Sequence, residues 1–154
     1  MLHAELIPLC DRLRRSGRHV TIETAGTLYL PVACDLMSIS PKFASSAPSR
    51  QQHARWHTRH QSARFRPEVV RRLIAQHVYQ LKFVIDRVED LQELADYLVA
   101  VAPVEADRIL LMPQGTDAAQ LDARAEWLRP YCQENGFVYC PRKQIEWYGS
   151  VRGT

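Results

Sequence analysis

The chain has 154 residues, of which 46% are hydrophobic and 24% are charged, a length and composition typical of one soluble globular domain. Its apolar stretches fall far short of the ~20 residues needed to cross a bilayer, and no charged region followed by an apolar run opens the sequence. These features argue against a membrane or secreted protein, and we expect a cytoplasmic one.

The net charge of +3 is unevenly distributed. Five arginines and three histidines, with no acidic residue, lie between Pro48 and Arg66, and the rest of the chain has a net charge of −2. The body of the domain is therefore no general binder of polyanions.

The four cysteines are Cys10, Cys34, Cys132 and Cys140. They lack the close spacing that a structural zinc ion or an iron–sulfur cluster requires. We expect them to be buried free thiols and not disulfides.

Hydrophobic periodicity predicts strands and helices in alternation. The expected strands are 19–24, 35–40, 80–86, 107–113 and one within 138–147. The expected helices begin near Leu2, at Pro67, near Leu91 and after Asp117, where Asp117 and Gln120 resemble a capping box. Gly17 and Gly136 are expected to end helices in the left-handed conformation. Pro130 is expected to kink the last helix.

The segment 43–66 has no hydrophobic period, and we expect a long basic loop there. The alternation of strands and helices predicts an α/β fold with a parallel sheet. We expect residues 1–154 to form one domain, as part of a larger βα barrel.

The carboxyl ends of parallel strands form the usual active face of such folds. The residues expected there are Glu23, Thr24, Gly26 and Thr27 after the first strand, Ser38, Ser40 and Lys42 after the second, and Gln114 after the fourth. This set suits a small heterocyclic ligand that forms hydrogen bonds, and it contains no nucleophile with a base, no phosphate loop and no metal triad. Each residue also has a purely structural interpretation, as a turn former, a strand-end cap or a solvated side chain.

Five segments resemble, in order, those of the 7-carboxy-7-deazaguanine synthase family. They are TIETAGTLYL (21–30), CDLMSISPK (34–42), QLKFVID (80–86), ILLMPQGT (109–116) and PRKQIEWYGSVRGT (141–154). The resemblance covers the chain from about Gly17 onward and implies a partial βα barrel of the radical S-adenosylmethionine (SAM) type.

The resemblance also implies an activity, that of a carbon–nitrogen lyase of queuosine biosynthesis. In this family a [4Fe–4S] cluster reduces SAM to a 5′-deoxyadenosyl radical, and 6-carboxy-5,6,7,8-tetrahydropterin is converted to 7-carboxy-7-deazaguanine with loss of ammonia. Members use magnesium and are usually homodimers.

Carried over by residue, the resemblance implies that Glu23, Thr24 and Thr27 form the substrate site, where Glu23 hydrogen-bonds the pterin ring and Thr24, Gly26 and Thr27 shape that strand end. It implies that Ser40 and Lys42 hold the ribose and carboxylate of SAM and that Gln114 meets SAM through its amide. It also places the stretch Arg152-Gly153-Thr154 near the substrate.

The sequence departs from the family pattern at two places. Ala25 stands where many members have asparagine, and the CxxxCxxC motif, the magnesium-binding residue and the GGEP-type stretch are absent. We therefore expect the chain to lack the amino-terminal, cluster-binding half and to be inactive alone. The alternative is a non-catalytic pterin- or SAM-binding or assembly subunit that needs a separate cluster-bearing chain.

Three interpretations remain open for the basic segment: a solvated excursion, a lid over the active site, or a surface that contacts tRNA or another polyanion. Because the implied substrate is a free pterin, we expect no nucleic-acid partner.

Overall fold

A computed structural model describes residues 2–149 of the chain, and the side chains of 5–149. Its contacts group the chain into two compact units, Met1–Leu81 and Lys82–Thr154, and strand β3 (Tyr79–Ile85) passes from one to the other. The strand order is β1-β2-β3-β4-β5, and the pairs β1–β2, β2–β3 and β4–β5 are parallel. The predicted α/β class with a parallel sheet is confirmed, and the radical SAM partial barrel stays a prediction.

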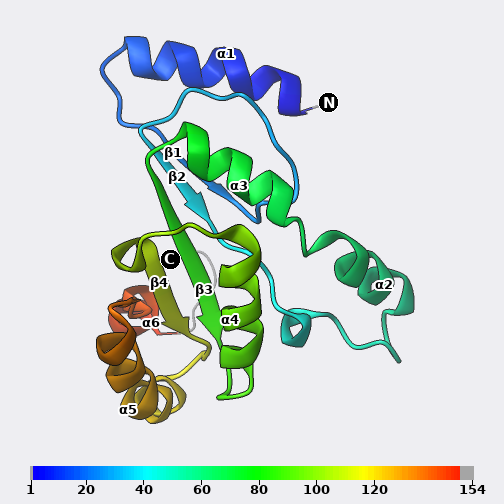
Figure 1. Ribbon diagram of the computed structural model, residues 1–154, viewed down its shortest axis with the longest axis vertical. Coiled ribbons are helices and arrows are strands. Elements are labelled where there is room, and N and C mark those ends of the chain that lie inside the picture. The colour runs from blue at the N-terminus through cyan, green and yellow to red at the C-terminus, as the bar shows by residue number, and fades with distance from the viewer. Residues whose placement is uncertain (1, 150–154) are drawn as a thin grey trace. The chain divides into compact units, whose positions relative to one another are not determined.

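The first unit contains two short strands and three α-helices before β3 begins (Figure 1). Its elements are α1 (Leu2–Arg15), β1 (Thr21–Thr24), β2 (Leu36–Ile39), the 3-10 helix η1 (Ala44–Ser46), α2 (Ala54–Ala63) and α3 (Pro67–Gln76). Gly17 follows α1 with φ +73°, as predicted. The expected strands 19–24 and 35–40 are confirmed with slightly shorter bounds.

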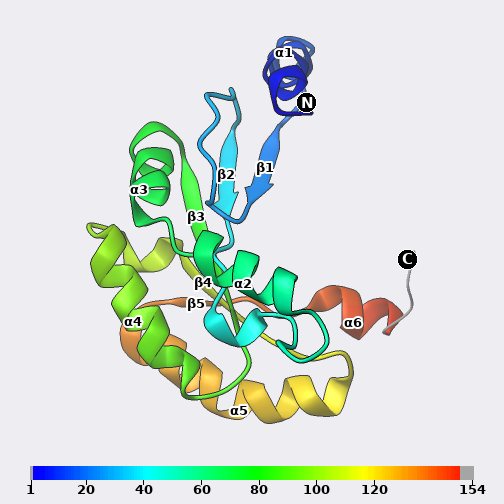
Figure 2. The same ribbon diagram turned by 90° about the vertical axis from the view of Figure 1, so that its right-hand side faces the viewer.

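Helix α3 packs against β2 on one face of the strands (Figure 2). Pro67 occupies the first turn of α3, where the missing N–H costs no intrahelical bond. Val70 and Leu73 of this helix are buried, as are Met37 and Ile39 of β2. Burying a side chain of this kind contributes about 1.5–3 kcal/mol, so this face forms the apolar core of the unit.

The expected continuous loop over 43–66 is wrong, because this segment contains η1 and the ten-residue helix α2. No residue of α2 is buried, so the helix leaves no apolar period in the sequence. Hydrogen bonds close in sequence hold it instead, from the Thr58 hydroxyl to the Ala54 carbonyl (3.0 Å) and between His57 Nδ1 and the Pro48 carbonyl (3.0 Å).

The second unit continues β3 and adds, over the described residues, three α-helices, two strands and one 3-10 helix. They are α4 (Asp90–Val101), β4 (Ile109–Pro113), α5 (Ala118–Asn135) and β5 (Val138–Tyr139), together with the 3-10 helix η2 (Ala106–Arg108) and the short helix α6 (Lys143–Tyr148). Every second residue of β3 from Leu81 to Ile85 is fully buried, and Phe83 packs edge-on against Tyr97 at 5.5 Å.

The ends of α5 form as the sequence predicts. The Asp117 side chain accepts a hydrogen bond from the backbone N–H of Gln120 (2.9 Å), and Gly136 closes the helix with φ +69°. The expected strand within 138–147 is present but short, because β5 stops at Tyr139 and α6 begins at Lys143. Pro141 explains the early end, since proline has no N–H to donate to a strand ladder.

None of the helices over residues 2–149 combines the length and the apolar character that a bilayer crossing requires.

Candidate functional site

The register of three parallel strands brings Glu23, Ser38 and Gln80 into one row within the first unit. Glu23 is paired with Ser38, and Ser38 with Gln80. Paired residues of neighbouring strands point to the same face of a sheet. The Gln80 amide donates a hydrogen bond to the Ser38 hydroxyl at 2.9 Å. A carboxylate, a hydroxyl and a carboxamide are thus fixed side by side.

Two further polar residues extend this row beyond the end of β2. The Ser40 N–H donates to the Thr24 carbonyl at 2.7 Å, so the β1–β2 ladder continues past the strand, and Ser40 lies on the Ser38 face. The Lys42 ammonium donates to the Ser40 hydroxyl at 3.1 Å. Ser40 is only 3% exposed, whereas Lys42 is exposed. The pair presents a positive group at the strand end above a buried hydroxyl.

We call these five residues the polar row: Glu23, Ser38, Ser40, Lys42 and Gln80. Its chemistry is that of recognition, because it offers hydrogen-bond acceptors for N–H groups at one end and an ammonium for an anion at the other. It contains three of the six residues expected to bind substrate or SAM, namely Glu23, Ser40 and Lys42, together with Ser38, which the sequence also placed at a strand end. Gln80 was missed, although a carboxamide near the start of a strand whose only other strongly polar residue is Lys82 is a visible signal.

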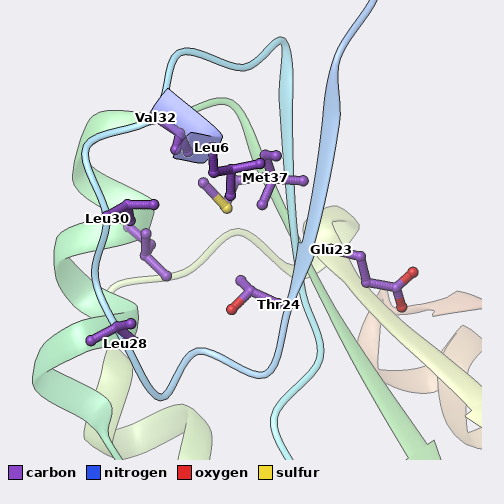
Figure 3. A pocket seen from close by; sticks show the side chains of 9 residues that line it. Leu6, Glu23, Thr24, Leu28, Leu30, Val32 and Met37 are labelled. Atoms are coloured by element: carbon purple, nitrogen blue, oxygen red, sulfur yellow. The ribbon is translucent and has the colours of Figure 1, made fainter. Parts of the chain in front are cut away.

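Thr24 does not join the polar row. Figure 3 shows the Glu23 and Thr24 side chains on opposite sides of β1, as the period of two in a strand requires. The Thr24 hydroxyl accepts a hydrogen bond from the Gly26 N–H at 3.1 Å, which stabilises the turn after the strand. Thr24 thus shapes the strand end, and its side chain cannot meet a ligand on the Glu23 face.

Thr24 instead faces an apolar cavity of about 200 Å³. The cavity is lined by Leu6, Ile22, Thr24, Leu28, Leu30, Val32, Met37 and Leu73, and Glu23 borders it while its carboxylate points away (Figure 3). Thr27 is exposed in the segment that leads from β1 around this cavity. Of the three predicted substrate residues, the structure therefore directs Glu23 and Thr24 to opposite faces of β1 (Figure 3).

Gln114 belongs to the second unit and follows β4 directly. Its N–H donates to the Ile85 carbonyl at 2.7 Å, which extends β4 along β3 by one residue. Arg142 donates from Nη1 to the Gly115 carbonyl at 3.0 Å and, more weakly, to the Gln114 side-chain oxygen at 3.5 Å. Arg142 thus fixes the turn that carries Gln114, a role that no sequence signal indicated.

The described side chains do not fit a cluster or a tightly bound metal ion. No group of three or more His, Cys, Asp or Glu residues among them is arranged to hold a metal. Burial also raises the pKa of the Cys34 and Cys140 thiols, and it raises the pKa of Cys132 to about 11. Burial thus disfavours the thiolates that would be the ligands.

The stretch Arg152-Gly153-Thr154, expected near the substrate, lies outside the described residues.

Two curated relatives match the chain over nearly its whole length. The 7-carboxy-7-deazaguanine synthase of Rhodopirellula baltica is 42% identical over 150 residues, which are 97% of this chain and 58% of that protein. The 7-carboxy-7-deazaguanine synthase of Halobacterium salinarum is 34% identical over 163 aligned positions, covering 100% of this chain and 63% of that protein. The chain thus spans about three fifths of the length of these relatives.

No protein-family model matches the chain. No solved structure matches it either.

Proposed function

Since the chain belongs by sequence to the 7-carboxy-7-deazaguanine synthase family, we propose that it supplies the pterin- and SAM-binding strand ends of such a synthase. The reaction is the SAM-dependent radical ring contraction of 6-carboxy-5,6,7,8-tetrahydropterin to 7-carboxy-7-deazaguanine, with loss of ammonia. The proposal rests above all on the 42% identity that extends over 97% of the chain.

Glu23 is the proposed anchor of the pterin ring. A carboxylate can accept two parallel hydrogen bonds from the paired N–H donors of a guanidine-like edge. Glu23 stands next to Ser38, which Gln80 holds by its amide hydrogen bond. With Ser38 fixed in this way, a planar ring that lies along the row can be bound in one orientation.

Ser40 and Lys42 are the proposed SAM contacts of the first unit, and Gln114 is that of the second. An ammonium can bind the carboxylate of SAM. A hydroxyl can form a hydrogen bond with its ribose, and a carboxamide can form hydrogen bonds with the donor and acceptor atoms of its adenine. Bound SAM would supply the radical that starts the reaction. Because no group of three or more His, Cys, Asp or Glu residues among the described ones is arranged to hold a metal, we assign no ligand for the [4Fe–4S] cluster or Mg²⁺ to them.

Replacing Glu23 by glutamine tests the proposal. We expect the full chain to bind 6-carboxytetrahydropterin, and Glu23→Gln to weaken binding roughly 10- to 100-fold, the usual effect of losing a charge-assisted hydrogen bond. Isothermal titration calorimetry measures both affinities. Glu134→Gln removes a carboxylate from an exposed position of α5 and should leave the affinity unchanged. Equal pterin binding by wild type and Glu23→Gln would contradict the role of Glu23.

A second candidate is a non-catalytic binding or assembly subunit that works with a separate cluster-bearing chain. The spacing of the four cysteines favours it, because no close triplet is present. After anaerobic reconstitution with iron and sulfide, formation of 5′-deoxyadenosine from SAM by the chain alone would eliminate this candidate. Binding of pterin and SAM without any such product would support it.

A homodimer, the usual state in the family, is the proposed assembly, and sedimentation analysis checks it.

A further inference from the structure

Helix α2 carries a surface for which neither the core nor the proposed reaction accounts. No side chain of the helix is buried. The segment 43–66 around it contains five arginines, three histidines and no acidic residue. A helix with no buried side chain in so basic a segment gains little from packing, and its charge complements an anionic partner.

One face of α2 combines an aromatic ring with cationic side chains. Trp56, Arg59, His60 and Ala63 follow the three- and four-residue spacing of one helical face. Trp56 is 57% exposed, and the Arg59 guanidinium carbon lies 5.6 Å from the centre of its ring. The indole surface is therefore accessible beside a positive charge.

This face borders an open groove of about 710 Å³, which we call the α2 groove. The groove is lined by Pro48, His53, Trp56, Arg59, His60 and Ala63. The arginines farther along the segment make local contacts: Arg64 donates to the Gln61 side chain at 2.8 Å, and Arg66 to the Ser62 carbonyl at 3.3 Å. Arg59 is thus the arginine that lines the groove itself.

We propose that the α2 groove binds single-stranded nucleic acid, with a base stacked on Trp56 and a backbone phosphate on Arg59. Stacking platforms flanked by positive charge are the usual recognition device for unpaired strands, since every base has a π face and every nucleotide a phosphate. An acidic peptide would pair with the positive charges but would offer no base to stack on the exposed indole ring of Trp56. The proposal is independent of the proposed enzymatic function, and it opposes the expectation of no nucleic-acid partner.

Fluorescence anisotropy with labelled 12-nucleotide oligo(U) and oligo(dT), over a series of salt concentrations, tests the proposal. For the full chain we expect affinity to fall with salt, with a log–log slope of about 0.7 for each phosphate contact. Trp56→Ala should weaken binding roughly tenfold and leave the slope unchanged, because it removes stacking and no charge. Arg59→Ala should lower the slope by about 0.7. Tighter binding of oligo(U) would identify RNA as the ligand, and equal binding would identify any single strand.

The chain offers matched controls in the second unit. Trp147 is 67% exposed, and the Lys143 ammonium lies 5.8 Å from its ring centre. Trp147→Ala therefore removes an exposed tryptophan that, like Trp56, lies beside a cation. Arg108→Ala removes the same charge as Arg59→Ala. Both controls should bind as the wild type does. Circular dichroism should show all variants folded, since α2 buries no side chain.

Three results would overturn the proposal. They are binding that does not respond to salt, an equal loss in Trp147→Ala and Trp56→Ala, and binding of poly-glutamate as tight as that of oligo(U). The last result would assign the groove to an acidic polypeptide instead.

Discussion

Side-chain direction decides what each residue of the candidate site can do. Glu23 and Thr24 are neighbours in sequence and were both expected to bind substrate, yet β1 directs them to opposite faces. On the Glu23 face the strand register supplies Ser38 and Gln80. On the Thr24 face it supplies an apolar cavity. A polar residue at a strand end is therefore a site candidate only when its side chain points to the same face of the sheet as the other site residues.

Gly26 is the residue on which the turn after β1 depends most. Its φ is +70°, and an added Cβ would lie 2.7 Å from Val70 Cγ2 and 3.0 Å from Ile39 Cγ2. Gly26→Ala should therefore lower the free energy of unfolding by roughly 2–5 kcal/mol, from about 1–2 for the left-handed conformation and about 1–3 for overpacking. Urea denaturation followed by circular dichroism measures this change.

Gly17 provides the matched control for Gly26. It has nearly the same φ, +73°, but an added Cβ there would meet nothing within 4 Å. Gly17→Ala should cost only the conformational part, about 1–2 kcal/mol. Equal losses in the two variants would show that the contacts with Val70 and Ile39 do not matter.

At the scale of elements, the sequence predicted the segments with a clear apolar period and missed helix α2, which has none. Strand β3 and helix α3 carry alternating or periodic apolar residues such as Phe83 and Leu73, and both were found. Helix α2 has no buried residue, so nothing in its pattern distinguished it from a loop. Strand β5 lies within the expected range but ends at Tyr139, since Pro141 has no N–H with which to continue the ladder.

The candidate site was predictable in its residue types and only partly in its geometry. Strand ends gave Glu23, Ser40 and Lys42, because sheet topology places them together whatever the exact register. Gln80 acts by donating a hydrogen bond to Ser38 on the paired strand. Arg142 acts by a long-range hydrogen bond to the Gly115 carbonyl. Contacts between residues distant in sequence depend on the register and loop path of the folded chain, which periodicity alone does not specify.

The amino-terminal cap of α5 is a further property of an element that can be tested. The Asp117 carboxylate accepts from the Gln120 N–H at 2.9 Å, one of the donors that a helix start leaves without an intrahelical partner. Asp117→Ala should lower the free energy of unfolding by about 1 kcal/mol, and Asp117→Asn, which keeps an acceptor, should restore most of it. Thermal or urea denaturation of the three proteins decides this. A loss in Asp117→Asn as large as in Asp117→Ala would argue that charge, and not capping, is what matters.

At the scale of the whole chain, the polar row lies in the first unit, and Gln114 with its Arg142 clamp lies in the second. The proposed contacts can therefore be assayed unit by unit, Glu23 through the pterin and Ser40 with Lys42 through SAM in the first unit, and Gln114 through SAM in the second. The cysteines allow a similar comparison of structure. Each unit contains one buried cysteine, Cys10 or Cys132, and one partly exposed cysteine, Cys34 or Cys140, and all four are free.

Thiol labelling should therefore report on both units in one experiment. Burial raises the pKa of Cys34 and Cys140, and the nearby Lys82 opposes part of this rise at Cys140. Burial raises the pKa of Cys132 to about 11. Since the thiolate is the reactive form, labelling of Cys34, Cys132 and Cys140 at pH 7.5 should be slow and should accelerate as pH rises towards 9. Cys34 and Cys140 should react before Cys10 and Cys132, because reagent reaches the buried pair only after local opening.

Mass spectrometry of iodoacetamide adducts, resolved by peptide, measures this order of labelling. In 8 M urea all four cysteines should react at similar rates, which provides the reference for each site. Rapid labelling of Cys132 in the native chain would show that the core beneath α5 opens easily, against its burial at 1% exposure. Rapid labelling of Cys10 alone would locate such opening in the first unit, where the binding of pterin to the polar row should then suppress it.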